Sequence, residues 1–131
     1  MLDSRLGVIG GYLAFAISWL AQLISGCHIN PKSIISGGVF LPHAVGIIIG
    51  EGCVVEKGVS IYQNVTLGRK NGLNTGYPTL KSGCAVYSGA VIIGAITVGR
   101  DAIVGANSFV SKHVIDGSVV AGAPARVIQS V

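Results

Sequence analysis

The chain has 131 residues, of which half are hydrophobic and only 11% are charged, and its formal net charge is +4. This length corresponds to a single domain. The lysines and arginines are scattered rather than interleaved with aromatic residues, which argues against a nucleic-acid-binding protein; a small positive balance better suits an anionic small molecule. The scarcity of charge also predicts that other copies of the chain cover much of the surface.

Residues 1–25 form a separate hydrophobic segment, because no charged residue occurs from Leu6 to Ser25. A signal peptide is disfavoured, since Asp3 lies beside Arg5 and no A-x-A cleavage site follows. The segment is just long enough for a membrane-spanning helix, but its glycines and polar residues weaken that interpretation. We expect a helix that caps the open end of the following domain, and contact with a membrane stays an alternative. The face that would form the cap is Tyr12, Phe15, Trp19 and Leu23.

Residues 26–131 carry aliphatic side chains at six-residue intervals, which predicts an all-β parallel β-helix. Helices and ordinary strands have periods of 3.6 and 2, whereas one hexapeptide forms one side and one corner of a β-helical coil. Residues eighteen apart should therefore stack, such as Leu80 on Val98 and Val86 on Val104. The series is Ile29, Ile35, Leu41, then Ile49, Val55, Ile61, Leu67, then Leu80, Val86, Ile92, Val98, Val104 and Val110.

Two further features of this period concern its corners and its first interruption. The step from Leu41 to Ile49 is eight residues, so one side of a coil should hold about two extra residues. The position four after each periodic residue is usually small or β-branched, and a second inward-facing side chain is expected there. These residues are Val39, Val45, Cys53, Val59, Val65, Cys84, Ala90, Ala102, Ser108 and Val114.

The three cysteines, Cys27, Cys53 and Cys84, are odd in number and lack CxxC spacing. We expect reduced core thiols in a cytoplasmic protein, because a disulfide framework or a zinc site needs other spacings.

A loop is predicted at residues 68–79, because the step from Leu67 to Leu80 is thirteen residues instead of six and Gly, Asn, Thr and Pro dominate the segment. An excursion from a rigid solenoid is a natural place for a functional site, although a tolerated insertion is the plainer alternative.

The chain has only three histidines, His28, His43 and His113. His43 should point outward near a corner, between apolar residues where partial desolvation would keep it neutral and basic. His28 precedes the first coil and falls on the same side of the solenoid, so that the two rings could meet. His113 is expected to be a surface residue.

Several segments together resemble the serine acetyltransferase branch of the hexapeptide-repeat acyltransferases. They are LPHAVGIIIGEGCVVEKGVSIYQNVTLG, the loop ending in YP, IIGAITVGRDAIVGANSFV, and AGAPARVI, within residues 26–128. The resemblance implies a left-handed β-helix, a homotrimer with active sites between subunits, and acetyl transfer from acetyl-CoA to a hydroxyl without a metal. It also implies that His43 is the general base, since imidazole has a suitable pKa for removing a hydroxyl proton.

The resemblance places the other site residues by matching segments. Small residues would line the pantetheine arm of CoA, and Arg126 would lie near its phosphates; for the terminal segment, a plain chain exit is the alternative. The CoA-binding residues are Gly68, Ser88, Gly105, Ala106, Gly122, Pro124, Ala125 and Arg126. Tyr77 and Glu51 would lie beside the acceptor.

The chain also departs from this family. Pro42 stands where the family has an aspartate, and Gly76 and Tyr77 replace an Arg-His pair that handles the amino acid. His28 replaces the aspartate that orients the base, and it could fix the tautomer of His43 without stabilising the imidazolium as a carboxylate does. These departures point to an acceptor other than serine. A short chain with one hydrophobic N-terminal helix resembles the O-acetyltransferases that modify sugars during capsular polysaccharide or exopolysaccharide assembly at the inner face of the membrane, and this resemblance implies a sugar hydroxyl as the acceptor.

Three alternatives stay open. The chain could be a serine O-acetyltransferase of cysteine biosynthesis. It could be a non-catalytic solenoid that serves as an interaction module. A metal enzyme of carbonic-anhydrase type would need three histidines that converge on zinc, and the spacing of the three here disfavours it.

Overall fold

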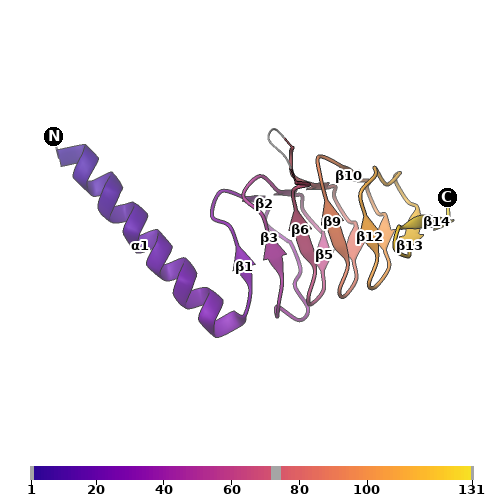
Figure 1. Cartoon of the computed structure of the whole chain (residues 1–131), viewed down its shortest axis with the longest axis horizontal. Coiled ribbons are helices and arrows are strands. Elements are labelled where there is room, and N and C mark those ends of the chain that lie inside the picture. Colours follow the sequence, from indigo (N-terminus) through magenta and orange to yellow (C-terminus); the bar gives the residue numbers. More distant parts are fainter. Residues whose placement is uncertain (1, 72–74, 131) are drawn as a thin grey trace.

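The protein is a triangular parallel β-helix with one long helix at its N-terminal end (Figure 1). The computed structural model describes residues 2–71 and 75–130. Residues 72–74 of the predicted loop lie outside the described residues. The solenoid is left-handed, as the resemblance implied.

Three sheets form the sides of the solenoid, and the inner coils each give one short strand to each sheet. The first coil reaches the third sheet, and the last coil the second, only through the isolated bridges of Phe40 and Val114. The first sheet contains β1 (His28–Ile29), β3 (Ile48–Ile49), β6 (Thr66–Gly68), β9 (Val91–Ile93) and β12 (Phe109–Val110). The second contains β2 (Ile34–Ile35), β4 (Val54–Val55), β7 (Thr79–Leu80) and β10 (Thr97–Val98). The third contains β5 (Ser60–Ile61), β8 (Ala85–Val86), β11 (Ile103–Val104), β13 (Val119–Ala121) and the antiparallel β14 (Arg126–Gln129).

The six-residue period is confirmed as the core of this solenoid. Leu80 is the register partner of Val98, and Val86 is the partner of Val104, as expected for residues eighteen apart. The periodic side chains from Ile49 to Val110 are all buried. Each contributes about 1.5–3 kcal/mol of burial free energy, and stacking lets a narrow solenoid bury them without a globular core.

The first interruption of the period is confirmed and located. Phe40 pairs with Ser60 and Ile35 with Val55, both at a spacing of twenty, whereas Ile49 pairs with Leu67 at eighteen. The two extra residues therefore lie between Leu41 and Val45, because the carbonyl of Val45 already accepts the N–H of Asn64 in the next coil.

The corner prediction holds for most positions and is wrong at Val45, whose side chain is 59% exposed. The extra residues push Val45 outward, and the fully buried Ile47 fills the inward position instead. Val114 is buried but pairs with Val98 of the periodic series, because the last coil is two residues shorter. Other corners use Asn64, Asp101 and Asn107 with φ between 55° and 59°, a left-handed conformation that Asn and Asp tolerate well.

All three cysteines are free and buried in this core. Burial raises the pKa of Cys53 to about 11 and that of Cys84 to about 12. Thiols held protonated in this way react poorly, which fits core residues rather than redox groups.

The N-terminal helix α1 (Leu2–Ser25) does not cap the solenoid, contrary to the expectation. It extends away from the first coil (Figure 1). The four residues expected to form the capping face are between 58% and 75% exposed. The physical reason is that the turn at Gly26, with φ of 67°, directs the helix outward from β1.

Candidate functional site

The predicted site residues lie on two of the three edges of the solenoid. The corners between the third and first sheets form what we call the His43 edge, which includes residues 42–46, 62–64, 87–89 and 105–107. The corners between the first and second sheets form the loop edge, which includes residues 30–33, 50–53, 68–71 and 75–78. The two edges are separated by the width of the first sheet.

His43 lies in the two-residue insertion at the His43 edge. The next coil has only Tyr62 and Gln63 between its buried strand and Asn64. The carbonyl of His43 accepts the N–H of Val45 at 2.8 Å, which closes a tight turn. The side chain of His43 is exposed. The insertion therefore presents an accessible imidazole on a rigid scaffold.

Most of the predicted CoA residues continue along this same edge toward the C-terminus. The carbonyl of Gln63 accepts the N–H of Gly89 at 3.0 Å, and the carbonyl of Ser88 accepts that of Asn107 at 2.9 Å. These bonds place Ser88 one coil beyond Gln63, and Gly105 and Ala106 one coil beyond Ser88.

Gly122, Pro124 and Ala125 complete the edge at the last coil. The N–H of Phe109 donates to the carbonyl of Gly122, and the N–H of Ala125 donates to the carbonyl of Phe109, both at 2.9 Å. The segment therefore runs beside β12 before it returns as β14. Arg126 begins β14 and is exposed.

A hollow of about 360 Å³ opens at the C-terminal end of the solenoid. Lys112, His113 and Arg126 line it together with apolar residues of β12 and β14. A cationic rim over an apolar floor suits a phosphorylated nucleotide. His113 is exposed, as expected. Its Nδ1 accepts the N–H of Thr97 at 3.0 Å, at a position where the shortened last coil has no strand to supply a backbone carbonyl.

Two features of the His43 edge were missed by sequence analysis. The rings of Tyr62 and Tyr87 stack at 4.8 Å with an interplanar angle of 13°. The Oε1 atom of Gln63 is buried and accepts no hydrogen bond from any described residue. Tyr62 and Tyr87 are 25 residues apart in the sequence because the loop lies between them. Only the strand register of the structure shows that they occupy equivalent positions in neighbouring coils.

The loop edge holds Glu51, Gly68 and Tyr77. The ring of Tyr77 lies directly over Gly50 and Gly52, where a β-carbon at either position would collide with it. Glu51 is exposed, and the Nζ atom of Lys32 lies 3.9 Å from its Oε2. The loop therefore folds back and places one aromatic ring beside one carboxylate.

One chain does not bring these two edges together. From Gly46 to Glu51 the backbone crosses the first sheet, which spans roughly 15 Å at about 3.3 Å per residue. A single site that uses both His43 and Tyr77 would therefore need the loop edge of a second copy. Gly68 is separated in the same way from the other residues predicted to bind CoA.

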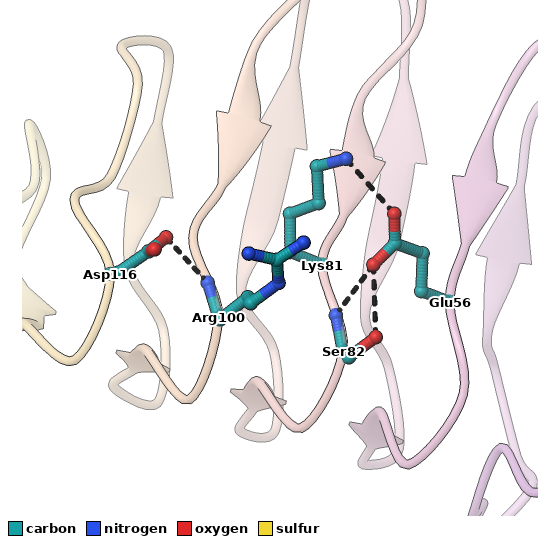
Figure 2. A network of polar contacts seen from close by, with 5 residues as sticks. All are labelled: Glu56, Lys81, Ser82, Arg100 and Asp116. Carbon is teal, nitrogen blue, oxygen red and sulfur yellow. Dashed lines mark hydrogen bonds and ion pairs between the residues drawn. The ribbon is translucent and has the colours of Figure 1, made fainter.

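The third edge, between the second and third sheets, has a structural network and none of the predicted site residues. Glu56 accepts hydrogen bonds from Nζ of Lys81 at 2.9 Å and from the N–H and Oγ–H of Ser82 at 2.9 and 3.0 Å (Figure 2). The Lys81 bond first, and then the two Ser82 bonds, lower the pKa of Glu56 to about 2. The N–H of Arg100 similarly donates to Asp116 at 2.8 Å.

His28 does not bond to His43, contrary to one sequence-based expectation. Its Nδ1 lies 3.1 Å from Oε1 of Gln22 in α1. One coil on, the register partner of His28 is Ile48 in the first sheet, whereas His43 lies at the preceding corner. Among residues 2–71 and 75–130, no three His, Cys, Asp or Glu side chains are close enough to hold a metal ion.

Comparison with known proteins gives a consistent result. A scan against protein-family models found no match. Serine acetyltransferase of Bacillus licheniformis is 39% identical over 119 residues, which are 89% of this chain and 55% of that protein. Serine acetyltransferase of Helicobacter pylori J99 is 39% identical over 118 residues, which are 89% of this chain and 69% of that protein.

Solved structures agree with these relatives. A serine acetyltransferase in complex with cysteine superimposes with a TM-score of 0.87 at 36% identity, covering 91% of this chain and 50% of that one. The Brucella abortus enzyme in complex with coenzyme A gives a TM-score of 0.84 at 37% identity, covering 88% and 47%.

The chain spans about half the length of the Bacillus relatives and of these two solved structures. The match covers His43 and both edges, and for the Helicobacter relative it covers more than two thirds of that protein's own length. On this evidence the chain belongs to the serine acetyltransferase family.

Proposed function

We propose that the protein is an acetyl-CoA-dependent O-acetyltransferase. The observation that carries the proposal is the position of His43, an accessible imidazole at the start of an edge that continues through Ser88 and Gly105 to the C-terminal hollow. The structure of a relative with coenzyme A bound supports a CoA substrate. The cationic rim at Arg126 would hold the phosphates, and the small residues of the edge would let the pantetheine arm approach the backbone.

His43 would act as the general base. Its neutral imidazole takes the proton of the acceptor hydroxyl while the oxygen attacks the thioester carbonyl. The C–S bond then breaks, CoA leaves as a thiolate, and the imidazolium returns the proton to the sulfur. The buried Oε1 of Gln63, on the next coil, accepts no hydrogen bond from any described residue, and it could bind an N–H of the pantetheine arm.

Serine is the first acceptor to consider, because the named relatives are serine acetyltransferases. A sugar hydroxyl is the second, and Tyr77 is the observation that favours it. An aromatic ring fixed over Gly50 and Gly52 offers a flat apolar surface suited to a pyranose face. The site would lie between two copies of the chain, since His43 and Tyr77 are on different edges.

The decisive experiment is calorimetric titration of the full chain with acetyl-CoA. We expect micromolar binding that weakens at least tenfold in Arg126→Ala. Arg100→Ala is the matched control, since it removes an equal charge from the third edge. If the folded protein does not bind, or if both variants lose affinity equally, the transferase proposal is wrong.

The acceptor is then decided by CoA release in the presence of L-serine or of nucleotide sugars and oligosaccharides. Turnover with serine alone would assign the family's acceptor to this chain. Turnover with sugars alone would assign the second candidate. Binding of acetyl-CoA without turnover on either acceptor class would leave neither assignment supported.

A further inference from the structure

The helix α1 is long, carries no charged residue from Leu6 to Ser25, and is exposed over that stretch except at Ser18 and Ser25, which are half-buried. Arg5–Ser25 has a mean hydropathy of 1.6, and none of the segment is buried. It contacts β1, and its stretch from Gly11 to Gln22 borders a hollow of about 420 Å³ against residues 28–32. The rest of the helix extends away from the solenoid (Figure 1). Water is a poor environment for such a surface, so another partner must cover it.

The apolar surface is distributed around the helix in an unusual way. At 100° per residue, the large apolar side chains cover an arc of about 200°. The rest of the circumference carries Gln22 and small residues. The small residues recur every three or four positions: Gly7, Gly11, Ala14, Ser18, Ala21 and Ser25. The large residues are all at least 55% exposed: Leu6, Val8, Ile9, Tyr12, Leu13, Phe15, Ile17, Trp19, Leu20, Leu23 and Ile24.

This arrangement is the reverse of what a helix in water requires. A cap or a coiled coil in water buries large side chains at its contact and exposes charged ones. Here only the small residues form a narrow face, and the large ones would remain outside any bundle. Helices in lipid show this pattern, because small residues permit close helix packing and lipid covers the large side chains.

The length of the segment separates spanning a membrane from lying on its surface. Its 21 residues would extend about 31 Å, close to the ~30 Å hydrocarbon core. A helix that lies on the surface needs a charged face, and Leu6–Ser25 contains no charged residue.

The first coil supplies an independent observation. Ile34, Ile35 and Phe40 are 65%, 39% and 62% exposed at the end of the solenoid that bears α1. Ile35 belongs to the core series but has no coil beneath it. We propose that α1 spans a lipid bilayer and holds this end of the solenoid against the membrane surface. The proposal does not depend on acetyl transfer.

Flotation of the purified full chain with phosphatidylcholine–phosphatidylethanolamine vesicles tests this directly, without acetyl-CoA or acceptor. We expect the wild type to float and to stay with the vesicles after a carbonate wash at high pH. Leu13→Lys combined with Ile17→Lys puts two charges at mid-helix and should lower the floating fraction at least tenfold. Ile115→Lys is the control, because Ile115 is 73% exposed at the opposite end, and it should float like the wild type.

Circular dichroism and thermal unfolding show whether the double variant retains its solenoid. Three results would overturn the proposal. The wild type could remain in the aqueous fraction as a folded protein, the double variant could float as well as the wild type, or carbonate could release the wild type. Intact mass of the cell-derived protein adds a fourth: a product that begins after Ser25 would identify a cleaved export signal.

Discussion

At the scale of single residues, His43 combines exposure with a fixed backbone. The two-residue insertion lifts it out of the coil without disturbing the strands on either side, since Ile35 and Ile49 both keep their register. The sequence indicated the insertion from one step of eight, but the hydrogen bond from Asn64 to Val45 was needed to place it around His43.

Replacing the base should slow the reaction more than it weakens binding. We expect His43→Ala to lower kcat by about 10²–10⁴-fold, the usual contribution of general base catalysis, while the Kd for acetyl-CoA changes little. His28→Ala is the matched comparison, because His28 bonds to Gln22 rather than to His43. Steady-state kinetics that show His43→Ala within tenfold of the wild type would exclude His43 as the base.

Glu56 predicts how stability depends on pH. Its folded pKa of about 2 lies below the ordinary value of 4.5, so its contribution is complete above about pH 4.5. The contribution is lost as the pH falls from there toward 2. Glu56→Gln should therefore have a lower Tm than the wild type at pH 7, and the two Tm values should converge near pH 2. Glu51→Gln is the control, because the exposed ion pair of Glu51 with Lys32, at 3.9 Å, should contribute little to stability. A difference in Tm between Glu56→Gln and the wild type that does not change with pH would contradict this account.

Gly50 has a steric role that the sequence did not reveal. Its backbone does not have positive φ, and the main obstacle to alanine there is the ring of Tyr77; the carbonyl oxygen of Leu67, at 3.3 Å from the β-carbon, adds a smaller one. We expect Gly50→Ala to displace that ring and raise KM for the acceptor several-fold. In a Tyr77→Ala background the same substitution should have almost no effect, and a double-mutant cycle measures the difference. Equal effects in both backgrounds would show that the ring is not the cause.

At the scale of elements, the shortened last coil is completed by a side chain. His113 accepts the N–H of Thr97 in a place where other coils offer a strand carbonyl. Its expected position on the surface was right, but this structural role appears only once Val114 is known to pair with Val98.

We expect His113→Ala to lower the free energy of unfolding by about 1 kcal/mol, the net value of one hydrogen bond. His113→Asn should recover part of the loss, since its Oδ1 can replace Nδ1 as the acceptor. Lys112→Ala, next in sequence, is the control. Urea denaturation measures the free energy of unfolding of all three variants. If His113→Asn loses as much of it as His113→Ala, the imidazole ring stabilises the coil by packing rather than by its hydrogen bond.

At the scale of the whole molecule, the proposed site would need an assembly, because His43 and Tyr77 lie on different edges of one chain. Inactive His43→Ala and weakened Tyr77→Ala chains should restore each other when they are co-expressed, because some interfaces then combine an intact His43 edge with an intact loop edge. With random mixing of equal amounts, about one quarter of the interfaces are intact. Activity assays of the co-purified mixture check this, and chains mixed after separate assembly are the control. Activity no greater than the average of the two parents would place the whole site within one chain.

The sequence by itself determined the solenoid, its stacking distance, the loop, and the line of small residues along one edge. A strict period of six has no other local explanation, because each periodic residue repeats the same environment. The tertiary structure decided which candidates share an edge, since the insertion at residues 42–44, the loop and the shortened last coil change the spacing that relates neighbouring coils. It also decided that α1 points away from the solenoid. The direction of this helix depends on the turn at Gly26 and on what covers the helix surface, and a local pattern of residues specifies neither of them.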